Sequence, residues 1–208
     1  MNEYNSEIKK LVNELTFEEN LNFALSCINR LKHLPHCIIN SGTYALQYLE
    51  EVENISKEAI EKTLNELSEE VNNESLNISN KAINEKIKIL DKLMVDTEED
   101  GSTAGGVFLN YLIIMQHILS YINEKTYENV YWCSTQLLEI IDAIEHEKYY
   151  IENESCVDKE ASKFVDLILE KEMEKQKQII KIIRKGSKKI LNEYVERNFI
   201  NFDIIGKK

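Results

Sequence analysis

Proline and glycine are scarce in this sequence, with 1 Pro and 6 Gly among 208 residues. Collagen-like chains and many disordered chains are rich in these two residues, so the scarcity excludes both classes. Apolar residues make up 43% of the sequence. A chain of this length can therefore bury a core that needs no metal or disulfide to hold it. The composition fits one compact domain or two small ones.

Cysteine is also rare, and no two cysteines form a CxxC pair. The four copies are Cys27, Cys37, Cys133 and Cys156. The first ten residues, MNEYNSEIKK, lack the apolar core of a signal peptide. The longest apolar stretch, residues 111–119, is interrupted by Gln116 and His117 and falls short of the roughly 20 residues that a membrane span needs. We therefore expect a reduced, cytoplasmic protein with no membrane partner.

Arginine is the third scarce residue, since only 3 of the 25 basic side chains are Arg. Arginine reads guanine and phosphate with two hydrogen bonds at once. The charge is also unevenly placed. Residues 1–155 hold 28 acidic and 12 basic side chains, a net charge of −16, while residues 156–208 carry +4. Because a negative field repels phosphate backbones and attracts basic proteins, we expect no nucleic-acid partner for residues 1–155.

Apolar residues recur at spacings of three and four along most of the chain, and sustained alternation is missing. This pattern predicts an all-α fold of about eight or nine helices. They are expected at about 4–15, 17–31, 44–52, 55–71, 78–94, 104–122, 126–150, 158–185 and 192–202. Thr16 and Glu19 form a capping box before the second helix, and Pro35 is expected to stop that helix. Gly186 is a natural C-cap for the long helix at 158–185.

A break and an apolar helix define the predicted architecture. Residues 95–102 are acidic and end close to three glycines, so we expect a loop joining helical subregions at about 1–94 and 103–208. The helix at about 104–122 is apolar nearly all round, which is typical of a helix surrounded by others. We therefore predict a single domain over residues 1–208, a multi-helix bundle around this central helix.

Three stretches of the chain follow a pattern known from one bacterial family. In residues 15–37, a helix with Phe23, Ala24 and Cys27 ends in RLKHLPH and leads to an aromatic-led helix around 44–49. In residues 96–142, an acidic loop, small residues and an apolar helix precede a helix that contains Trp132 and Asp142. The third stretch is the helix at 160–185 with the tail at 201–206. In this order of segments the chain resembles the YjaG-like proteins, a family of unknown function.

The resemblance implies an all-α fold and carries over no catalytic residue. Proteins that resemble this pattern also occur among immunity proteins, which protect bacteria from their own polymorphic toxins. The resemblance thus implies a non-enzymatic protein that binds a toxin domain. The sequence departs from the pattern in its richness in Lys and Asn and in its basic C-terminal helix, and these departures bear on the surface that would bind the partner.

A competing hypothesis rests on His33, His36 and Cys37, which lie close together in the sequence. Imidazole and thiolate are ligands that zinc prefers, and a closed site would need a further ligand such as Cys133 or His146. The alternative is a histidine pair at a helix end beside a small buried cysteine. These residues define the hypothesis of a metal-binding protein or metal-dependent enzyme.

Common catalytic patterns are missing. The sequence contains no GxSxG, HExxH or GxGxxG, and no His follows a Glu at the spacing of a di-iron bundle. The glycine-rich segment 101–106 could hold an anion at a helix start, or Ser102 or Thr103 could simply cap that helix. His117 is expected to be a core histidine bonded to a carbonyl. We therefore predict no catalytic residue and no cofactor.

Acidic residues gather in four groups. They are Glu50, Glu51 and Glu53; Glu66, Glu69 and Glu70; Glu98, Glu99 and Asp100; and Glu139, Asp142, Glu145 and Glu147. Solvated helix faces explain such groups by default, since exposed acids keep a protein soluble. The functional hypothesis is a docking surface for a basic protein such as a nuclease toxin, which is basic because its substrate is anionic.

Aromatic residues near one helix start could supply anchors for the same partner. A core position for Trp132 is the open alternative. The predicted partner-binding residues are Glu98, Glu99, Asp100, Tyr127, Tyr131, Trp132, Glu139 and Asp142. Residues 171–189 carry eight basic side chains around four isoleucines. Cations are favoured at a helix C-terminus and can pair with the acidic residues 1–155, while membrane or RNA binding is the alternative for this segment.

Overall fold

The computed structural model describes residues 2–40, 80–98, 102–153 and 158–202, which contain helices and turns and no strand. The helices are α1 (Asn2–Asn13), α2 (Phe17–Asn29), α3 (Leu34–Asn40), α6 (Asn80–Glu98), α7 (Thr103–Glu124), α8 (Tyr127–Glu152), α9 (Asp158–Arg184) and α10 (Lys188–Arg197). The all-α fold is thus confirmed. The helices predicted at 44–52 and 55–71 lie outside the described residues, so the expected total of eight or nine stays a prediction.

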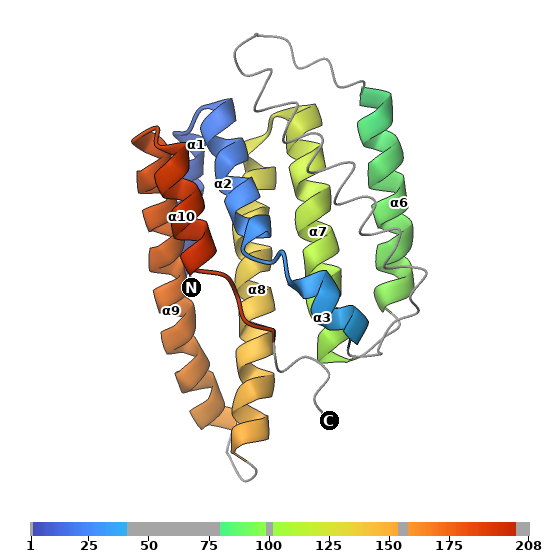
Figure 1. Ribbon diagram of the computed structural model, residues 1–208, viewed down its shortest axis with the longest axis vertical. Helices are drawn as coiled ribbons and strands as arrows, with labels where there is room; N and C mark the ends of the chain where they lie inside the picture. The colour runs from blue at the N-terminus through green and yellow to red at the C-terminus, as the bar shows by residue number, and fades with distance from the viewer. Residues whose placement is uncertain (1, 41–79, 99–101, 154–157, 203–208) are drawn as a thin grey trace.

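The helices form a bundle with α7 and α8 at its centre (Figure 1). α7 packs against α6 and α8 and also contacts α2 and α3, while α8 further contacts α1, α2 and α9. Val107, Leu112 and Met115 of α7 are completely buried. α7 is long and apolar enough to cross a membrane by length and composition, but 61% of its most apolar window is buried by the rest of the bundle. The apolar helix predicted at 104–122 is therefore a packed helix of the core.

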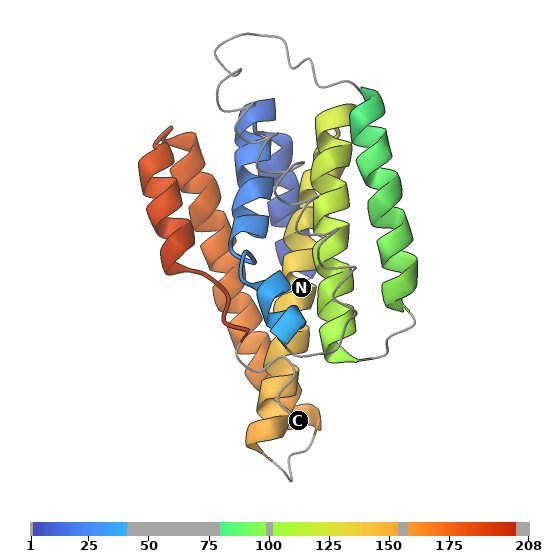
Figure 2. The same cartoon turned by 45° about the vertical axis from the view of Figure 1, so that its right-hand side comes forward.

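α8 and α9 form a long antiparallel hairpin whose far end projects beyond the other helices (Figures 1 and 2). α1 and α2 also pack on this hairpin, and α10 folds back along α9. After α10 the chain runs back towards the end of α2, where the Ile200 amide donates to the Arg30 carbonyl at 3.1 Å. Phe199 packs edge-on against His33 with ring centroids 5.3 Å apart, and Phe202 is buried. The C-terminal segment thus closes one side of the bundle.

Local signals account for several helix ends. The capping box at α2 is present, since the Thr16 amide donates to Glu19 Oε2 at 2.8 Å and the Glu19 amide donates to Thr16 Oγ1 at 3.2 Å. Ser102 caps α7 by accepting from the Gly105 amide at 3.0 Å, which confirms the capping interpretation of segment 101–106. Gly186 follows α9 with φ of 70°, a conformation that favours glycine.

Thr16→Ala should lower the free energy of unfolding by about 1 kcal/mol, because two amides at the start of α2 lose the reciprocal cap. Urea denaturation followed by circular dichroism measures this change. Ser162→Ala is a matched control, since it removes an exposed hydroxyl from inside α9, where alanine is a good helix former. Equal stability of Thr16→Ala and the wild type would show that the capping box does not stabilise the fold.

Three predicted boundaries are wrong. α6 continues to Glu98, four residues into the expected loop 95–102, because no glycine or proline precedes Gly101 there. Pro35 does not stop a helix; it lies in the first turn of α3, where its missing N–H costs no helical hydrogen bond. The last helix, α10, ends at Arg197 and begins four residues earlier than predicted, because Ser187 caps it by accepting from the Ile190 amide.

Candidate functional site

An acidic groove runs between α8 and α9. Its cavity volume is about 280 Å³. The residues that line it are Thr135, Leu138, Glu139 and Asp142 of α8, and Asp166, Leu169, Glu170 and Met173 of α9. Leu138 and Leu169 are buried at its base, whereas Glu139, Asp166 and Glu170 are exposed. The groove therefore combines an apolar floor with carboxylates along both edges.

The spacing of these residues explains why they meet. On each helix the lining positions follow the pattern i, i+3, i+4, i+7, which places four side chains on one helical face. The hairpin is antiparallel, so the face that begins at Thr135 and the face that begins at Asp166 border the same groove. The two helices thus contribute two carboxylates each.

The groove carries a concentrated negative charge. Among the described residues, no Lys or Arg lines it, so four carboxylates face a shared space without a lysine or arginine between them. His146 Nδ1 lies 3.4 Å from Asp142 Oδ1, one turn along α8. Carboxylates beside an apolar floor attract a cationic side chain whose methylene stem covers the floor while its head reaches the acids.

The predicted partner-binding residues are only partly brought together. Glu139 and Asp142 line the groove. Trp132, 43% exposed, lies on α8 two turns before Glu139, so the core alternative for Trp132 is wrong. Its ring packs against Tyr131, with centroids 5.2 Å apart. Tyr127 and Tyr131 are half-buried against the core. The side chain of Glu98 and all of Glu99 and Asp100 lie outside the described residues.

The α9 edge of the groove is absent from the sequence-based prediction. Asp166, Glu170 and Met173 stand at a helical spacing that could have indicated a shared face. What the sequence did not reveal is that this face borders Glu139 and Asp142. That proximity depends on how α8 and α9 pack, which is a tertiary property.

The described part of the chain provides no set of ligands for the predicted metal site. Among the side chains that the structure describes, no group of three or more His, Cys, Asp or Glu residues could hold a metal ion. His33 is exposed and packs on the C-terminal segment, while Cys133 is buried with its thiol 3.8 Å from the Ile114 carbonyl. The His146 ring contacts its own helix at the Asp142 carbonyl. The side chain of His36 lies outside the described residues.

His117 is half-buried on α7, and its Nδ1 lies 3.1 Å from Asn129 Oδ1 at the start of α8. The carbonyl oxygen predicted to bond to His117 is therefore that of the Asn129 side chain and not one of the backbone. Burial lowers the pKa of His117 below its ordinary value, although the bond to Asn129 and the charge of Glu124 oppose that shift. Its ring stacks on the exposed Trp132 with centroids 6.4 Å apart. His117 thus helps to hold Trp132 at the surface.

Two cysteines are chemically protected by the core. Burial raises the pKa of Cys27 to about 12 and raises that of Cys133 well above its ordinary value. At pH 8 both thiols therefore stay protonated and poorly nucleophilic. In a Cys156→Ser background, we expect a disulfide reagent to modify the half-buried Cys37 in the native protein. Cys27 and Cys133 should react only after unfolding, and rapid modification of all three would contradict this burial.

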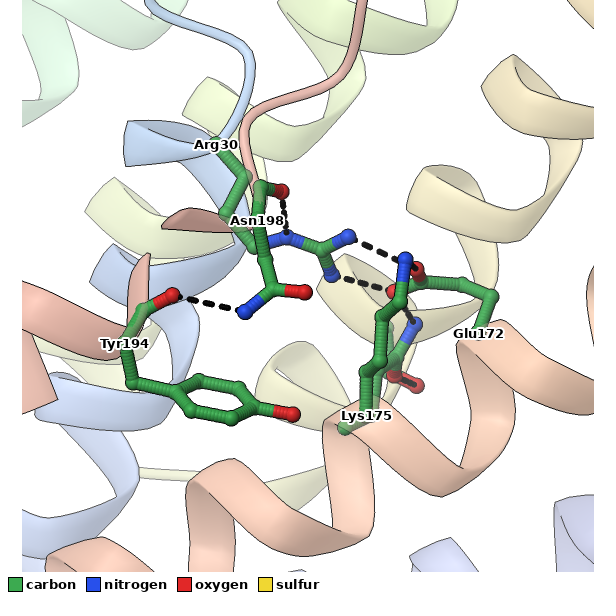
Figure 3. Close-up of polar contacts among 7 residues, drawn as sticks. Arg30, Glu172, Lys175, Tyr194 and Asn198 are labelled. Carbon is green, nitrogen blue, oxygen red and sulfur yellow. Dashed lines mark hydrogen bonds and ion pairs between the residues drawn. The ribbon is translucent and has the colours of Figure 1, made fainter. Parts of the chain in front are cut away.

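The structure also contains a buried ion pair that was not predicted from the sequence (Figure 3). The guanidinium of Arg30 donates to both carboxylate oxygens of Glu172, with Nη2 2.6 Å from Oε2, and its Nε donates to the Asn198 carbonyl at 2.8 Å. Gln176 Nε2 lies 3.5 Å from Glu172 Oε1, and Ser134 Oγ donates to Gln176 Oε1 at 2.5 Å. This network joins α2, α8, α9 and the C-terminal segment. Arg30, Glu172, Gln176 and Ser134 are buried, while Lys175, 3.9 Å from Glu172, and Asn198 connect the network to the surface. We therefore interpret it as a structural feature of the core.

Comparison with known proteins adds no relative. No protein family matches the chain, and no curated protein or solved structure does so either. The resemblance to the YjaG-like family therefore stays a prediction, and the groove is the feature of the structure from which a function can be inferred.

Proposed function

We propose that this chain is a non-enzymatic binding protein and that a basic polypeptide docks in the groove between α8 and α9. The observation that carries the proposal is the set of four carboxylates, Glu139, Asp142, Asp166 and Glu170, around an apolar floor with no lysine or arginine among the lining residues. Such a surface favours a cationic protein and repels phosphate backbones and anionic membranes.

The partner that we propose is a basic toxin domain, with this chain acting as its immunity protein in the cytoplasm. A nuclease toxin must be basic to hold its anionic substrate, so an acidic inhibitor can bind the same surface and block it. Long-range attraction would also speed the encounter, which matters when a toxin has to be neutralised quickly. The exposed Trp132, two turns from Glu139 on α8, supplies an aromatic group of the kind that anchors protein interfaces.

Co-expression tests this function directly. We expect the wild-type protein to restore growth when it is co-expressed with a toxin gene from its own gene neighbourhood, if that neighbourhood encodes one. The variant Glu139→Gln, Asp166→Asn and Glu170→Gln should restore it less, because the groove keeps its shape but loses three charges. The matched control Glu152→Gln, Glu160→Gln and Glu196→Gln removes three exposed charges away from the groove and should protect like the wild type.

The growth result is paired with a direct binding measurement on the purified proteins. If both triple variants bound the toxin domain with equal affinity, the groove would not be the docking site. Failure of the wild type to bind the domain or to restore growth would contradict the immunity function itself.

A further inference from the structure

One helix of this chain already packs on the face between α8 and α9. α1 contacts both helices, with Ile8 and Val12 completely buried. Glu7 of α1 and Glu14 just after it pair with basic residues of α9: Lys177 Nζ lies 2.6 Å from Glu7, and Arg184 Nη2 lies 2.9 Å from Glu14. The face between α8 and α9 thus accepts a helix, with apolar side chains inside and ion pairs at the edge.

The open section of the groove continues the same faces. On α9, Asp166, Glu170, Met173, Lys177 and Arg184 follow one stripe at helical spacing, so the positions that pair with α1 and the positions that line the cavity lie in line. On α8, Tyr131 contacts Lys9 of α1, with Nζ 5.8 Å from the ring centroid. Thr135 lies a single helical turn beyond Tyr131, and the open section begins there.

The figures show the same continuity. α1 extends only about midway along the hairpin, and the lower halves of α8 and α9 run on beyond it (Figures 1 and 2). The charge of the side chains along this stripe of α9 changes from basic to acidic where α1 ends. Lys177 and Arg184 face acidic side chains at α1, whereas Asp166 and Glu170 face the open groove. Acidic side chains at α1 pair with basic residues of α9. By charge complementarity, the element that binds in the open section should therefore present basic side chains to Asp166 and Glu170.

We infer that the docking segment of the partner is a basic amphipathic helix that lies in the groove in line with α1. This inference rests on the proposed function and specifies the element that the groove binds. Apolar side chains of that helix cover Leu138, Leu169 and Met173, as Ile8 and Val12 cover the hairpin higher up. Lysine or arginine side chains at its edges reach the carboxylates of the groove.

The length of the open face sets the size of this helix. On α8 the lining residues run from Thr135 to Asp142, which is seven residue steps, or about 10 Å at the rise of an α-helix. A docking helix of about two turns covers these positions, and a peptide of roughly 14–16 residues supplies those turns with at least one more at each end. At the far end Tyr149 packs on Phe164, with ring centroids 5.2 Å apart, and Tyr150 and Leu167 are exposed. This apolar cluster lies nearer the tip of the hairpin, beyond the residues that line the groove.

The test uses a synthetic 16-residue peptide of Lys, Leu and Ala, with Leu at i, i+3, i+4 and i+7 and Lys beside this stripe. A peptide of the same composition in scrambled order is its control. We expect the wild-type protein to bind the first peptide at least about tenfold more tightly than the second at low salt. The circular dichroism of the mixture should show more helix than the sum of the separate spectra, because a free peptide of this length is only partly helical.

A charge swap locates the bound helix. Glu139→Lys with Glu170→Lys changes two exposed positions, so folding should be unaffected. This variant should bind the lysine peptide at least about tenfold less tightly and should gain affinity for a peptide with Glu in place of every Lys. Glu152→Lys with Glu160→Lys is the matched control and should bind the lysine peptide within about threefold of the wild type.

The peptide experiments test the docked helix, and the growth experiment tests the immunity function, so the two can fail independently. Equal binding of the lysine peptide by the two swapped variants, or binding without added helix, would overturn the docked helix while growth protection by the wild type still supported the proposed function. Loss of growth protection with the peptide results intact would overturn the immunity function and support the groove as a helix-binding site.

Discussion

Glu172→Ala should lower the free energy of unfolding by about 3–5 kcal/mol, because it leaves the guanidinium of Arg30 buried without its counter-charge. Arg30 and Glu172 are only 1% and 2% exposed, so water cannot replace the lost partner. The substitution also deprives Gln176 of a contact in the same network. Urea denaturation at pH 7, followed by circular dichroism, measures the change.

The matching control replaces both partners. Arg30→Met with Glu172→Leu removes the charges together and fills similar volume with apolar atoms, so it should recover most of the stability that Glu172→Ala loses. The wild type, Arg30→Met, Glu172→Leu and the double variant form a double-mutant cycle, which separates the attraction between the two side chains from the cost of burying either one alone. A single variant that loses less than about 1 kcal/mol would contradict the enclosure of this pair.

Leu112→Ala should lower the free energy of unfolding by about 2–5 kcal/mol, because it opens a cavity in the middle of α7. Leu112 is completely buried, and α7 packs against helices on several sides, so neighbouring side chains have little freedom to fill the space. Ile89→Ala on α6 removes a side chain that is 41% exposed and should cost under about 1 kcal/mol. Similar losses from both variants would contradict the central position of α7.

Features that depend on a few neighbouring residues could be predicted from the sequence. Thr16 and Glu19 cap α2 because their reciprocal bonds span three residues, and Gly186 ends α9 because glycine adopts a positive φ at little cost. The apolar pattern of α7 likewise requires burial on most of its surface, wherever its neighbours come from.

Features that depend on distant segments could not be predicted. Arg30 and Glu172 are 142 residues apart, and only packing of α2 against α9 joins them. A signal was nonetheless present: Arg30 lies on the same helical face as Phe23 and Cys27, and Glu172 lies between Leu169 and Gln176 on the buried face of α9. Opposite charges on two apolar faces indicate a buried pair, because neither can be enclosed alone.

The residues of the candidate site were likewise predictable only where they depend on one helix. Glu139 and Asp142 were predicted because they belong to an acidic group on one helix. Asp166 and Glu170 were missed because they join that group only when α9 packs antiparallel to α8. A single sequence shows the charge of each helix but not which faces of two helices adjoin.

The most direct test of the central claim is the association rate of the purified protein with the basic toxin domain that we propose as its partner, measured by stopped-flow fluorescence over a range of salt concentrations. If the groove carboxylates attract the partner, the variant Glu139→Gln, Asp166→Asn and Glu170→Gln should associate about tenfold more slowly than the wild type at low salt. The difference should shrink as salt screens the charges. Identical rates for the two proteins at low salt would contradict the claim that this groove recruits a basic partner.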